Sequence, residues 1–505
     1  MGDGEKKRLG ELFKALGTMV PLWETAGLAI TCPANGAVIA WLAPDSVESL
    51  SEKVSRAHAA QQAWSVLHRS QRVSLLEAVS TVLKQHREVL AEVLMLEAGK
   101  TAKEALVEVD GSAEVLLKTI RDAALPELNG MVRCKERPPV GVVGLITSFN
   151  FPLVVANWLV APALLARNAL VWKPSEKTPL TALAYKAVFA AAMGAHAGLL
   201  QIVIGGRDIG EALVAHERVD MVSATGSVAM GKGIKAALAV KKNNAVRPIL
   251  ELGGNNGVIV SEKISQAHLE WSLASLMGSF LGTSGQRCTN TRRLIVHRKI
   301  HEAAVAILQK HIEHFIASGA IQSPLSAVSN EYGYGPLIDG DAYDRFERAK
   351  KKVMEEGGKI LFGKRMLETQ YPNAYYVEPA LALLPKQTAL MHEEIFAPLL
   401  FIVPYDDIEQ AMAILNAPAN AGLVGGIYTQ SQSEADRFAA ENQAGHGLIN
   451  SPKGTGTPAF GMGFGGNKAS GEGEILNAAD PLRAFTREDS FSRIAQNKDV
   501  AMDKD

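Results

Sequence analysis

Cysteine is scarce in this chain, and one cysteine stands where a reactive thiol would be useful. The 505 residues include three cysteines, and Cys288 directly follows Arg287 in the run GTSGQRCTN. Glycines let the backbone approach a ligand closely, and a neighbouring cation favours the thiolate form of cysteine. A free cysteine is more often a small buried hydrophobe, so Cys288 alone is compatible with either role.

Two polar residues end apolar runs that have the composition of buried strands. Glu251 ends the run RPILE and is followed by two glycines, and Asn150 ends GVVGLITSFN. Parallel sheets bind ligands at the carboxyl ends of their strands. Glu251 is therefore a candidate general base, with a solvated strand end as the alternative. Asn150 is a candidate oxyanion donor, with a cap of the next helix as the alternative.

Two further segments suit a nucleotide. WKPSEKTP follows an apolar run and carries Lys173 and Glu176. The ammonium of Lys173 suits phosphate or ribose oxygens, and the carboxylate of Glu176 suits a ribose diol. GSVAMGKG, residues 226–233, has the spacing of a phosphate-binding loop, but Gly233 replaces the hydroxyl that would hold Mg²⁺. A phosphate on this glycine turn and the following helix start remains plausible without that metal.

Other motifs fail on inspection. HEAAV starts like a zinc-protease helix, but Val305 occupies the second histidine position. His311 and His314 share a helix face, and a solvated face accounts for them better than a metal site. GMGFGG, residues 461–466, lacks the strand that precedes a dinucleotide fingerprint. We therefore predict no metal site.

The elements that must position these residues follow from the hydrophobic pattern. Apolar residues recur at helical spacing over residues 46–123, with Gly99 and Lys100 as a stop within that range. From PPVGVVGLITSF onward, apolar β-rich runs alternate with helical stretches, and a second such series follows Cys288. Continuous apolar strands separated by helices predict an α/β fold, with parallel sheets covered on both faces.

Composition narrows the function classes. The chain is too long for one core, so we expect two or three domains. The net charge of −1 gives no support for nucleic acid or a membrane surface as a partner. Few, widely spaced cysteines indicate a reducing compartment. We see no apolar run of membrane-spanning length and no signal peptide, so we expect a cytoplasmic protein.

The motifs also occur together and in order. SFNFP, WKPSEKTP, ATGSVAMGK, ELGGNNG, GQRCTNTRR, EEIFAPL and FGGNKASGEGE resemble the aldehyde dehydrogenase superfamily. ELGGNN with GQRCTNTRRL is most similar to its antiquitin branch, the α-aminoadipic semialdehyde dehydrogenases. The resemblance implies NAD-dependent oxidation of an aldehyde, with NAD as cofactor and a small-molecule aldehyde as partner.

The resemblance also implies roles for single residues. Cys288 is the nucleophile, Glu251 the general base and Asn150 the oxyanion donor. Arg287 clasps a substrate carboxylate, or makes a structural ion pair, or serves only to favour the thiolate. The implied cofactor residues run from the adenosine ribose to the nicotinamide: Thr147, Ser148, Lys173, Ser175, Glu176, Gly206, Gly226, Ser227, Leu252, Glu394 and Phe396.

The implied architecture has three parts. A Rossmann-type cofactor domain spans 1–123 and 141–254, a second α/β catalytic domain spans 255–470, and a small β bridging element spans 124–140 and 471–505. Such chains form homodimers or homotetramers. Two alternatives are a catalytically silent protein that reuses the fold and an enzyme that passes the acyl group to coenzyme A. The presence of both Cys288 and Glu251 favours an oxidising enzyme with water as the acceptor.

Overall fold

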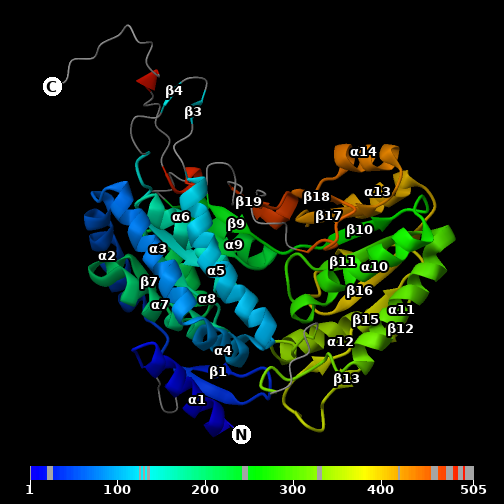
Figure 1. Ribbon diagram of the computed structural model, residues 1–505, viewed down its shortest axis with the longest axis horizontal. Coiled ribbons are helices and arrows are strands. Elements are labelled where there is room, and N and C mark those ends of the chain that lie inside the picture. The colour runs from blue at the N-terminus through cyan, green and yellow to red at the C-terminus, as the bar shows by residue number, and fades with distance from the viewer. Residues whose placement is uncertain are drawn as a thin grey trace.

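The computed structural model describes most of the chain, in these ranges: 2–19, 27–123, 127–128, 131–132, 137–241, 248–326, 333–418, 421–456, 464–473, 482–486 and 493–494. Two large sheets with helices on their faces form the body, and a small three-stranded sheet extends from it (Figure 1). The predicted α/β class is confirmed, and the predicted division into three domains stays a prediction.

The first part of the chain is mainly helical. α1 (Gly2–Ala15) precedes the antiparallel pair β1 (Leu28–Thr31) and β2 (Val38–Leu42). Four helices follow: α2 (Val47–Ser65), α3 (Arg69–Gln85), α4 (Arg87–Ala98) and α5 (Ala102–Asp122). Gly99 ends α4 with a left-handed φ of 68°, and a capping box of Thr101 and Glu104 starts α5. The predicted helices and the predicted stop are confirmed.

The six-stranded sheet has the order β19-β9-β8-β5-β6-β7. Its parallel strands are β5 (Val142–Ile146), β6 (Ala169–Lys173), β7 (Leu200–Ile202), β8 (Met221–Thr225) and β9 (Ile249–Glu251). The helices between them are α6 (Val154–Leu165), α7 (Pro179–Met193) with η1 (Gly194–Leu199), α8 (Arg207–Ala215) and α9 (Val228–Ala239). β19 (Gly471–Glu472) closes one edge antiparallel to β9.

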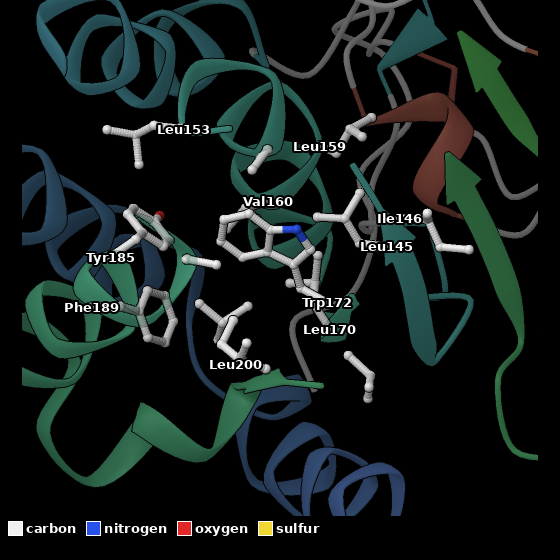
Figure 2. Packing of buried hydrophobic residues seen from close by; sticks show 14 of the residues in the cluster. Leu145, Ile146, Leu153, Leu159, Val160, Leu170, Trp172, Tyr185, Phe189 and Leu200 are labelled. Carbon is white, nitrogen blue, oxygen red and sulfur yellow. The ribbon is translucent and has the colours of Figure 1, made fainter. Parts of the chain in front are cut away.

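Fully buried side chains join this sheet to its helices. Figure 2 shows the Trp172 indole of β6 among leucines and valines of β5, β7 and α6, with Tyr185 and Phe189 of α7 beside them. Trp172 Nε1 donates to Thr147 Oγ1 at 2.8 Å, so the one polar atom of the ring has a partner. The packing of β6 thereby fixes a residue at the carboxyl end of β5.

One helical segment passes a length and hydropathy test for a membrane span. Among the described residues it is Pro179–Leu199, which comprises α7 and η1. In the fold, α7 packs against α3, α4 and β7. This is the position of a core helix that covers a sheet.

The seven-stranded sheet has the order β12-β15-β16-β11-β10-β17-β18, and β12 alone among its paired strands runs antiparallel. Its strands are β10 (Asn256–Val260), β11 (Thr291–His297), β12 (Lys359–Phe362), β15 (Ala380–Leu383), β16 (Leu399–Tyr405), β17 (Val424–Tyr428) and β18 (His446–Ile449). The larger helices are α10 (Gln266–Leu281), α11 (His301–Ala317), α12 (Gly340–Glu355), α13 (Ile408–Asn416) and α14 (Gln432–Glu441).

Short elements complete the described chain. They are η2 (Gly282–Gly285), η3 (Arg298–Ile300), β13 (Arg365–Met366), β14 (Tyr376–Val377), η4 (Ala389–His392), η5 (Lys468–Ser470) and η6 (Arg483–Phe485). The small sheet is built from β3 (Glu127–Leu128), β4 (Met131–Val132) and β20 (Arg493–Ile494). Its strands come from both segments assigned to the bridging element. Cys134 lies outside the described residues.

Candidate active site

The strand order of the six-stranded sheet reverses between β5 and β8. β6 and β7 extend the sheet from β5, whereas β9 extends it from β8. Open α/β sheets bind ligands at the carboxyl ends of their strands, beside such a reversal. Ser148, which follows β5, donates its backbone N–H to Thr225 Oγ1 of β8 at 3.2 Å. The predicted cofactor residues Ser148 and Gly226 therefore lie at this reversal.

Cys288 lies in the turn between η2 and β11, and side chains hold the backbone of this turn. The Arg287 N–H donates to Asn290 Oδ1 at 2.5 Å, and Asn290 Nδ2 donates to three carbonyl groups at the end of α10. Asn256, the first residue of β10, donates through Nδ2 to the Cys288 carbonyl at 2.7 Å. The thiol is thus carried by a backbone that β10 and α10 fix from two sides.

The residues just before this turn adopt an uncommon backbone. Thr283 and Ser284 have φ values of 53° and 55°, in the left-handed region that favours glycine. Glu104 Oε1 of α5 accepts the Thr283 N–H at 2.7 Å, and Ser284 Oγ donates to the Gly335 carbonyl at 2.7 Å. Such conformations persist when the surrounding structure over-determines them, and they cluster at functional sites.

Three charged groups act on the Cys288 thiol. Its pKa is raised to about 12, first by burial and then by the nearby carboxylates of Glu394 and Glu251, while the Arg292 guanidinium opposes this rise. Cys288 as a residue is intermediate in exposure, so the turn that carries it is not sealed from solvent. Nucleophile and candidate base therefore lie close enough to influence each other, although they come from different sheets.

Glu251 ends β9, where it faces Gly471 of β19 and Thr225 of β8. Burial raises the pKa of its carboxyl well above the ordinary value, and its Oε2 has no hydrogen-bond partner among the described residues. A general base works best when its pKa lies near the operating pH. A buried carboxyl of raised pKa, with Oε2 unpaired among the described residues, meets that need better than a solvated strand end does.

Asn150 is 5% exposed and lies in the turn before α6. Its Oδ1 accepts from Ser148 Oγ at 2.8 Å, which orients the amide so that its N–H groups are available to a ligand. The first residue of α6 is Val154, and no side chain of the preceding residue caps the helix. The alternative in which Asn150 caps α6 is therefore wrong.

The adenosine-side residues lie at the carboxyl ends of β5 and β6. Lys173 is 5% exposed, and its Nζ lies 3.6 Å from Glu176 Oε2. Burial lowers the Lys173 pKa, and Glu176 opposes that shift. Ser175 Oγ accepts the Lys177 N–H at 3.2 Å. An ammonium and a half-exposed carboxylate thus stand side by side at this edge.

Two helix starts stand at the same edge. Ser227 caps α9 by accepting the Met230 N–H at 3.1 Å, and Gly206 precedes the first residue of α8. Free N–H groups at a helix start attract phosphate. Leu252 is buried, and a Cβ at Gly231 of α9 would lie 2.3 Å from its Cδ1. Glycine at 231 therefore lets α9 approach the strand end that carries Glu251.

Glu394 and Phe396 lie between η4 and β16, beside the nucleophile. Glu394 Oε1 accepts the Gly254 N–H at 3.1 Å, and burial raises the pKa of its carboxyl. Phe396 has a φ of 59°, and its ring centroid lies 5.8 Å from that of Phe149. The Arg292 guanidinium carbon lies 5.4 Å from the Phe396 ring. The structure therefore places both predicted residues near Cys288.

Arg287 makes the ion pair that was its alternative role. Its Nη2 lies 3.1 Å from Glu104 Oε1, and its Nε donates to Thr283 Oγ1 at 2.9 Å. The side chain is 27% exposed, so the pair still presents a surface to solvent. Arg287 is thus a held guanidinium one residue before the nucleophile, while the guanidinium that opposes the rise of the Cys288 pKa is that of Arg292.

The sequence interpretation missed Arg292 and Glu104. Arg292 is 2% exposed and donates to the carbonyls of Gly285 and Arg287, at 2.5 and 2.8 Å, and to that of Ala397 at 3.3 Å. It ties the nucleophile turn to the loop of Phe396. The signal was a cationic pair in an otherwise apolar strand, TRRLIVH, where burial is costly without such partners.

Comparison with known proteins agrees with this geometry. The profile of the aldehyde dehydrogenase family matches residues 23–490. The chain is 31% identical over 493 residues to the alpha-aminoadipic semialdehyde dehydrogenase of Bos taurus, covering 95% of this chain and 88% of that protein.

Solved structures match over the same extent. The betaine aldehyde dehydrogenase of Staphylococcus aureus in complex with NAD+ superposes with a TM-score of 0.83, at 25% identity, covering 97% of this chain and 96% of that one. The glyceraldehyde-3-phosphate dehydrogenase of Methanocaldococcus jannaschii complexed with NADP gives 0.81, at 25% identity, covering 92% and 98%. Because both the fold and the family profile span the chain, this protein belongs to the aldehyde dehydrogenase family and oxidises aldehydes with a nicotinamide cofactor.

Proposed function

We propose that this aldehyde dehydrogenase uses NAD to oxidise a semialdehyde that carries a distal carboxylate. The observation that supports the chemistry best is the proximity of Cys288 to the buried carboxyls of Glu251 and Glu394. A thiol in the turn before β11, near a base without a hydrogen-bond partner on Oε2 among the described residues, suits covalent capture followed by hydrolysis.

Each catalytic side chain has one task. The Cys288 thiolate attacks the aldehyde carbon, and the Asn150 amide with the Cys288 backbone N–H stabilises the oxyanion; loss of one such donor typically costs about 3 kcal/mol or more. NAD, when bound, supplies the hydride acceptor. The collapse of the oxyanion leaves a thioester on Cys288. Glu251 then takes a proton from water, which attacks the thioester and releases the acid.

Water as the acyl acceptor follows from Glu251. An enzyme that transfers the acyl group to coenzyme A needs no base for water at this strand end. Here the carboxyl is buried, its pKa is raised, and Oε2 has no hydrogen-bond partner among the described residues. These properties favour hydrolysis over transfer to coenzyme A, and they leave no reason to favour a catalytically silent protein.

The cofactor edge fits a dinucleotide and supports NAD over NADP. Lys173, nearly buried, and the start of α9 offer an ammonium and free N–H groups at the sheet reversal. Glu176 is half exposed beside Lys173. Its carboxylate accepts hydrogen bonds from a ribose diol and repels a 2′-phosphate. Relatives of known structure bind either cofactor, so the preference rests on Glu176.

The position of Arg287 supports a substrate that carries a carboxylate. Its guanidinium is adjacent to the nucleophile in sequence and is held by Glu104 at a partly exposed position. A planar guanidinium binds a carboxylate through two parallel hydrogen bonds. The relative from Bos taurus is named for a semialdehyde of an amino acid. We further propose that the protein is cytoplasmic, because cysteine is scarce, and that it is a homodimer or homotetramer, as members of the family are.

The test is a pair of aldehydes of equal length. We expect the parent enzyme to prefer succinic semialdehyde to butanal in kcat/KM, measured by NADH absorbance. Arg287→Ala should reduce this preference about ten- to a hundredfold, because a charge-assisted hydrogen bond contributes about 1.5–3 kcal/mol. Arg298→Ala, which removes an exposed arginine paired with Asp406, is the matched control and should leave the preference unchanged.

Two results would contradict the substrate proposal. One is a parent enzyme without preference for the carboxylate-bearing aldehyde. The other is a preference that Arg287→Ala and Arg298→Ala alter equally. Neither result bears on the role of Cys288.

A further inference from the structure

A buried ion pair lies beneath the turn that carries Asn150. Lys100 Nζ lies 2.9 Å from Glu108 Oε2 of α5, and the two side chains are 1% and 0% exposed. Taking both charges out of water is costly, and such a pair is often no more stabilising than apolar side chains of the same volume. Stability alone therefore does not account for a charged pair here.

The second oxygen of Glu108 anchors the start of α6. Oε1 accepts the backbone N–H of Leu153 at 2.9 Å and that of Val154 at 3.3 Å. The first N–H groups of a helix have no partner within the helix, and α6 has no capping side chain at its own N-cap. Glu108 supplies this cap from α5, and the capped residue Leu153 lies three residues after Asn150.

Lys100 contacts the same turn through an aromatic ring. Its ammonium lies 3.9 Å from the centroid of Phe151, the residue that follows Asn150. The guanidinium carbon of Arg287, the residue before Cys288, lies 5.5 Å from that ring. Cations over an aromatic face are attracted to it. The Asn150 turn and the Cys288 turn therefore contact each other through Phe151.

These contacts determine where the Asn150 amide lies. Within the described part of the chain its side chain bonds locally, to Ser148, so its place depends on the backbone of residues 151–154. We infer that Glu108, held by Lys100, is a positioning residue that aims the Asn150 amide at the oxyanion formed on Cys288. The inference rests on the proposed role of Asn150 as an oxyanion donor.

The chain offers a matched control on the neighbouring helix α4. Glu97 is 0% exposed and accepts the N–H groups of Leu180 and Thr181 at the start of α7, together with the Thr181 hydroxyl. It is a similar cap, a buried carboxyl from one helix at the start of another, although burial raises the pKa of Glu97 to about 8. It differs in holding α7, not the turn of Asn150. Glu97→Gln therefore perturbs stability without perturbing that turn.

Two reagents separate the oxyanion from the thiolate. p-Nitrophenyl acetate is attacked at its carbonyl carbon; an oxyanion forms, the carbon–oxygen bond breaks, and p-nitrophenolate leaves an acetyl group on Cys288. Iodoacetamide is attacked at its methylene carbon, iodide leaves, and no oxyanion forms. The ratio of the two rate constants therefore reports the oxyanion donors and cancels changes in thiolate concentration.

We expect Glu108→Gln to lower this ratio about tenfold or more, because misplacing a catalytic group by about 1 Å has effects of that size. Asn150→Ala should lower the ratio at least as much, and Glu97→Gln should leave it within about twofold of the parent. If Glu108→Gln does not fold, Glu108→Asp keeps the charge opposite Lys100, withdraws the carboxylate from α6, and is judged by the same criterion.

The outcomes distinguish this inference from the proposed function. A ratio unchanged in the Glu108 variant, with Asn150→Ala impaired, overturns the inference alone. An equal loss in Glu97→Gln also overturns it, because the effect would then belong to any buried cap. A ratio unchanged in Asn150→Ala removes Asn150 from the proposed mechanism and the inference with it.

Discussion

The nucleophile turn and the cofactor edge are held in place by contacts of different range. The turn around Cys288 depends on partners far along the chain: Glu104 bonds Thr283 across 179 residues, and Arg292 bonds Ala397 across 105. The adenosine side of the cofactor edge is held mainly by local contacts, such as Ser227 with Met230 and Ser175 with Lys177, although Ser148 bonds Thr225 across 77 residues. The turn is thus held in place before a substrate binds, whereas polar groups at the cofactor edge remain available to bind the cofactor.

The two regions also differ in electrostatics. The nucleophile turn gathers two carboxyls of raised pKa and a buried guanidinium around one thiol. The cofactor edge has one ammonium and one half-exposed carboxylate. Changes to the turn should therefore alter rates by orders of magnitude, whereas changes to the edge should alter cofactor choice by small factors.

The largest expected effect separates the regions completely. Cys288→Ala should reduce NADH formation by more than about ten-thousandfold, because the proposed mechanism has no second nucleophile. Binding of NAD, followed by tryptophan fluorescence, should stay close to that of the parent. Measurable turnover by the pure variant would remove Cys288 from the mechanism, and loss of NAD binding would show that the two regions are not independent.

The pH dependence of the thiol gives the next effect. A thiol pKa of about 12 means that the thiolate fraction grows about tenfold per pH unit below that value. Alkylation of Cys288 by iodoacetamide in the cofactor-free enzyme should therefore keep rising from pH 7 to 10. Glu394→Gln removes a charge that raises this pKa, so it should accelerate alkylation at a given pH. A plateau below pH 8 would contradict the environment described for Cys288.

The smallest effect belongs to the cofactor edge. Glu176→Gln should reduce the preference for NAD over NADP by about two- to fivefold, since an exposed charge contributes up to about 1 kcal/mol. The iodoacetamide reaction should not change, because Glu176 belongs to the other region. The measurement is kcat/KM with each cofactor. A parent that favours NADP, or a variant with an unchanged ratio, would show that Glu176 does not set the choice.

The same contrast explains how far the sequence could predict the site. Lys173, Glu176, Gly226 and Ser227 are signalled by short motifs at strand ends. The side-chain contacts of Lys173 and Ser227 are local, whereas the Gly226 N–H donates to the Glu251 carbonyl of β9. Cys288, Glu251 and Asn150 each had an ordinary structural alternative, which only the family resemblance outweighed. The alternative in which Asn150 caps α6 was wrong, since Glu108 of α5 bonds the start of that helix. Because Glu108 lies far from Asn150 in the sequence, the residues around Asn150 do not indicate this contact.

The fold was easier to predict than the pairing of charges within it. Buried positions are apolar, and they recur at helical spacing over 46–123 and as continuous runs in the strands. Each segment therefore carries the signal for its own secondary structure. The Arg287 pair with Glu104 and the position of Arg292 depend on where α5 meets η2 and β11, and no local pattern specifies that meeting. Charged residues in apolar segments, such as Glu104, Glu108 and Arg292, are the available signal.

The central claim is that Cys288 and Glu251 act in sequence, one to form a thioester and the other to hydrolyse it. Rapid mixing of Glu251→Gln with NAD and the aldehyde of highest kcat/KM tests this claim most directly. We predict a burst of about one NADH per active site, a steady state slower than the parent's by about a hundredfold or more, and an acyl group on Cys288 in the intact mass. A variant with the parent's steady-state rate, or without a burst and an acyl adduct, would contradict the account.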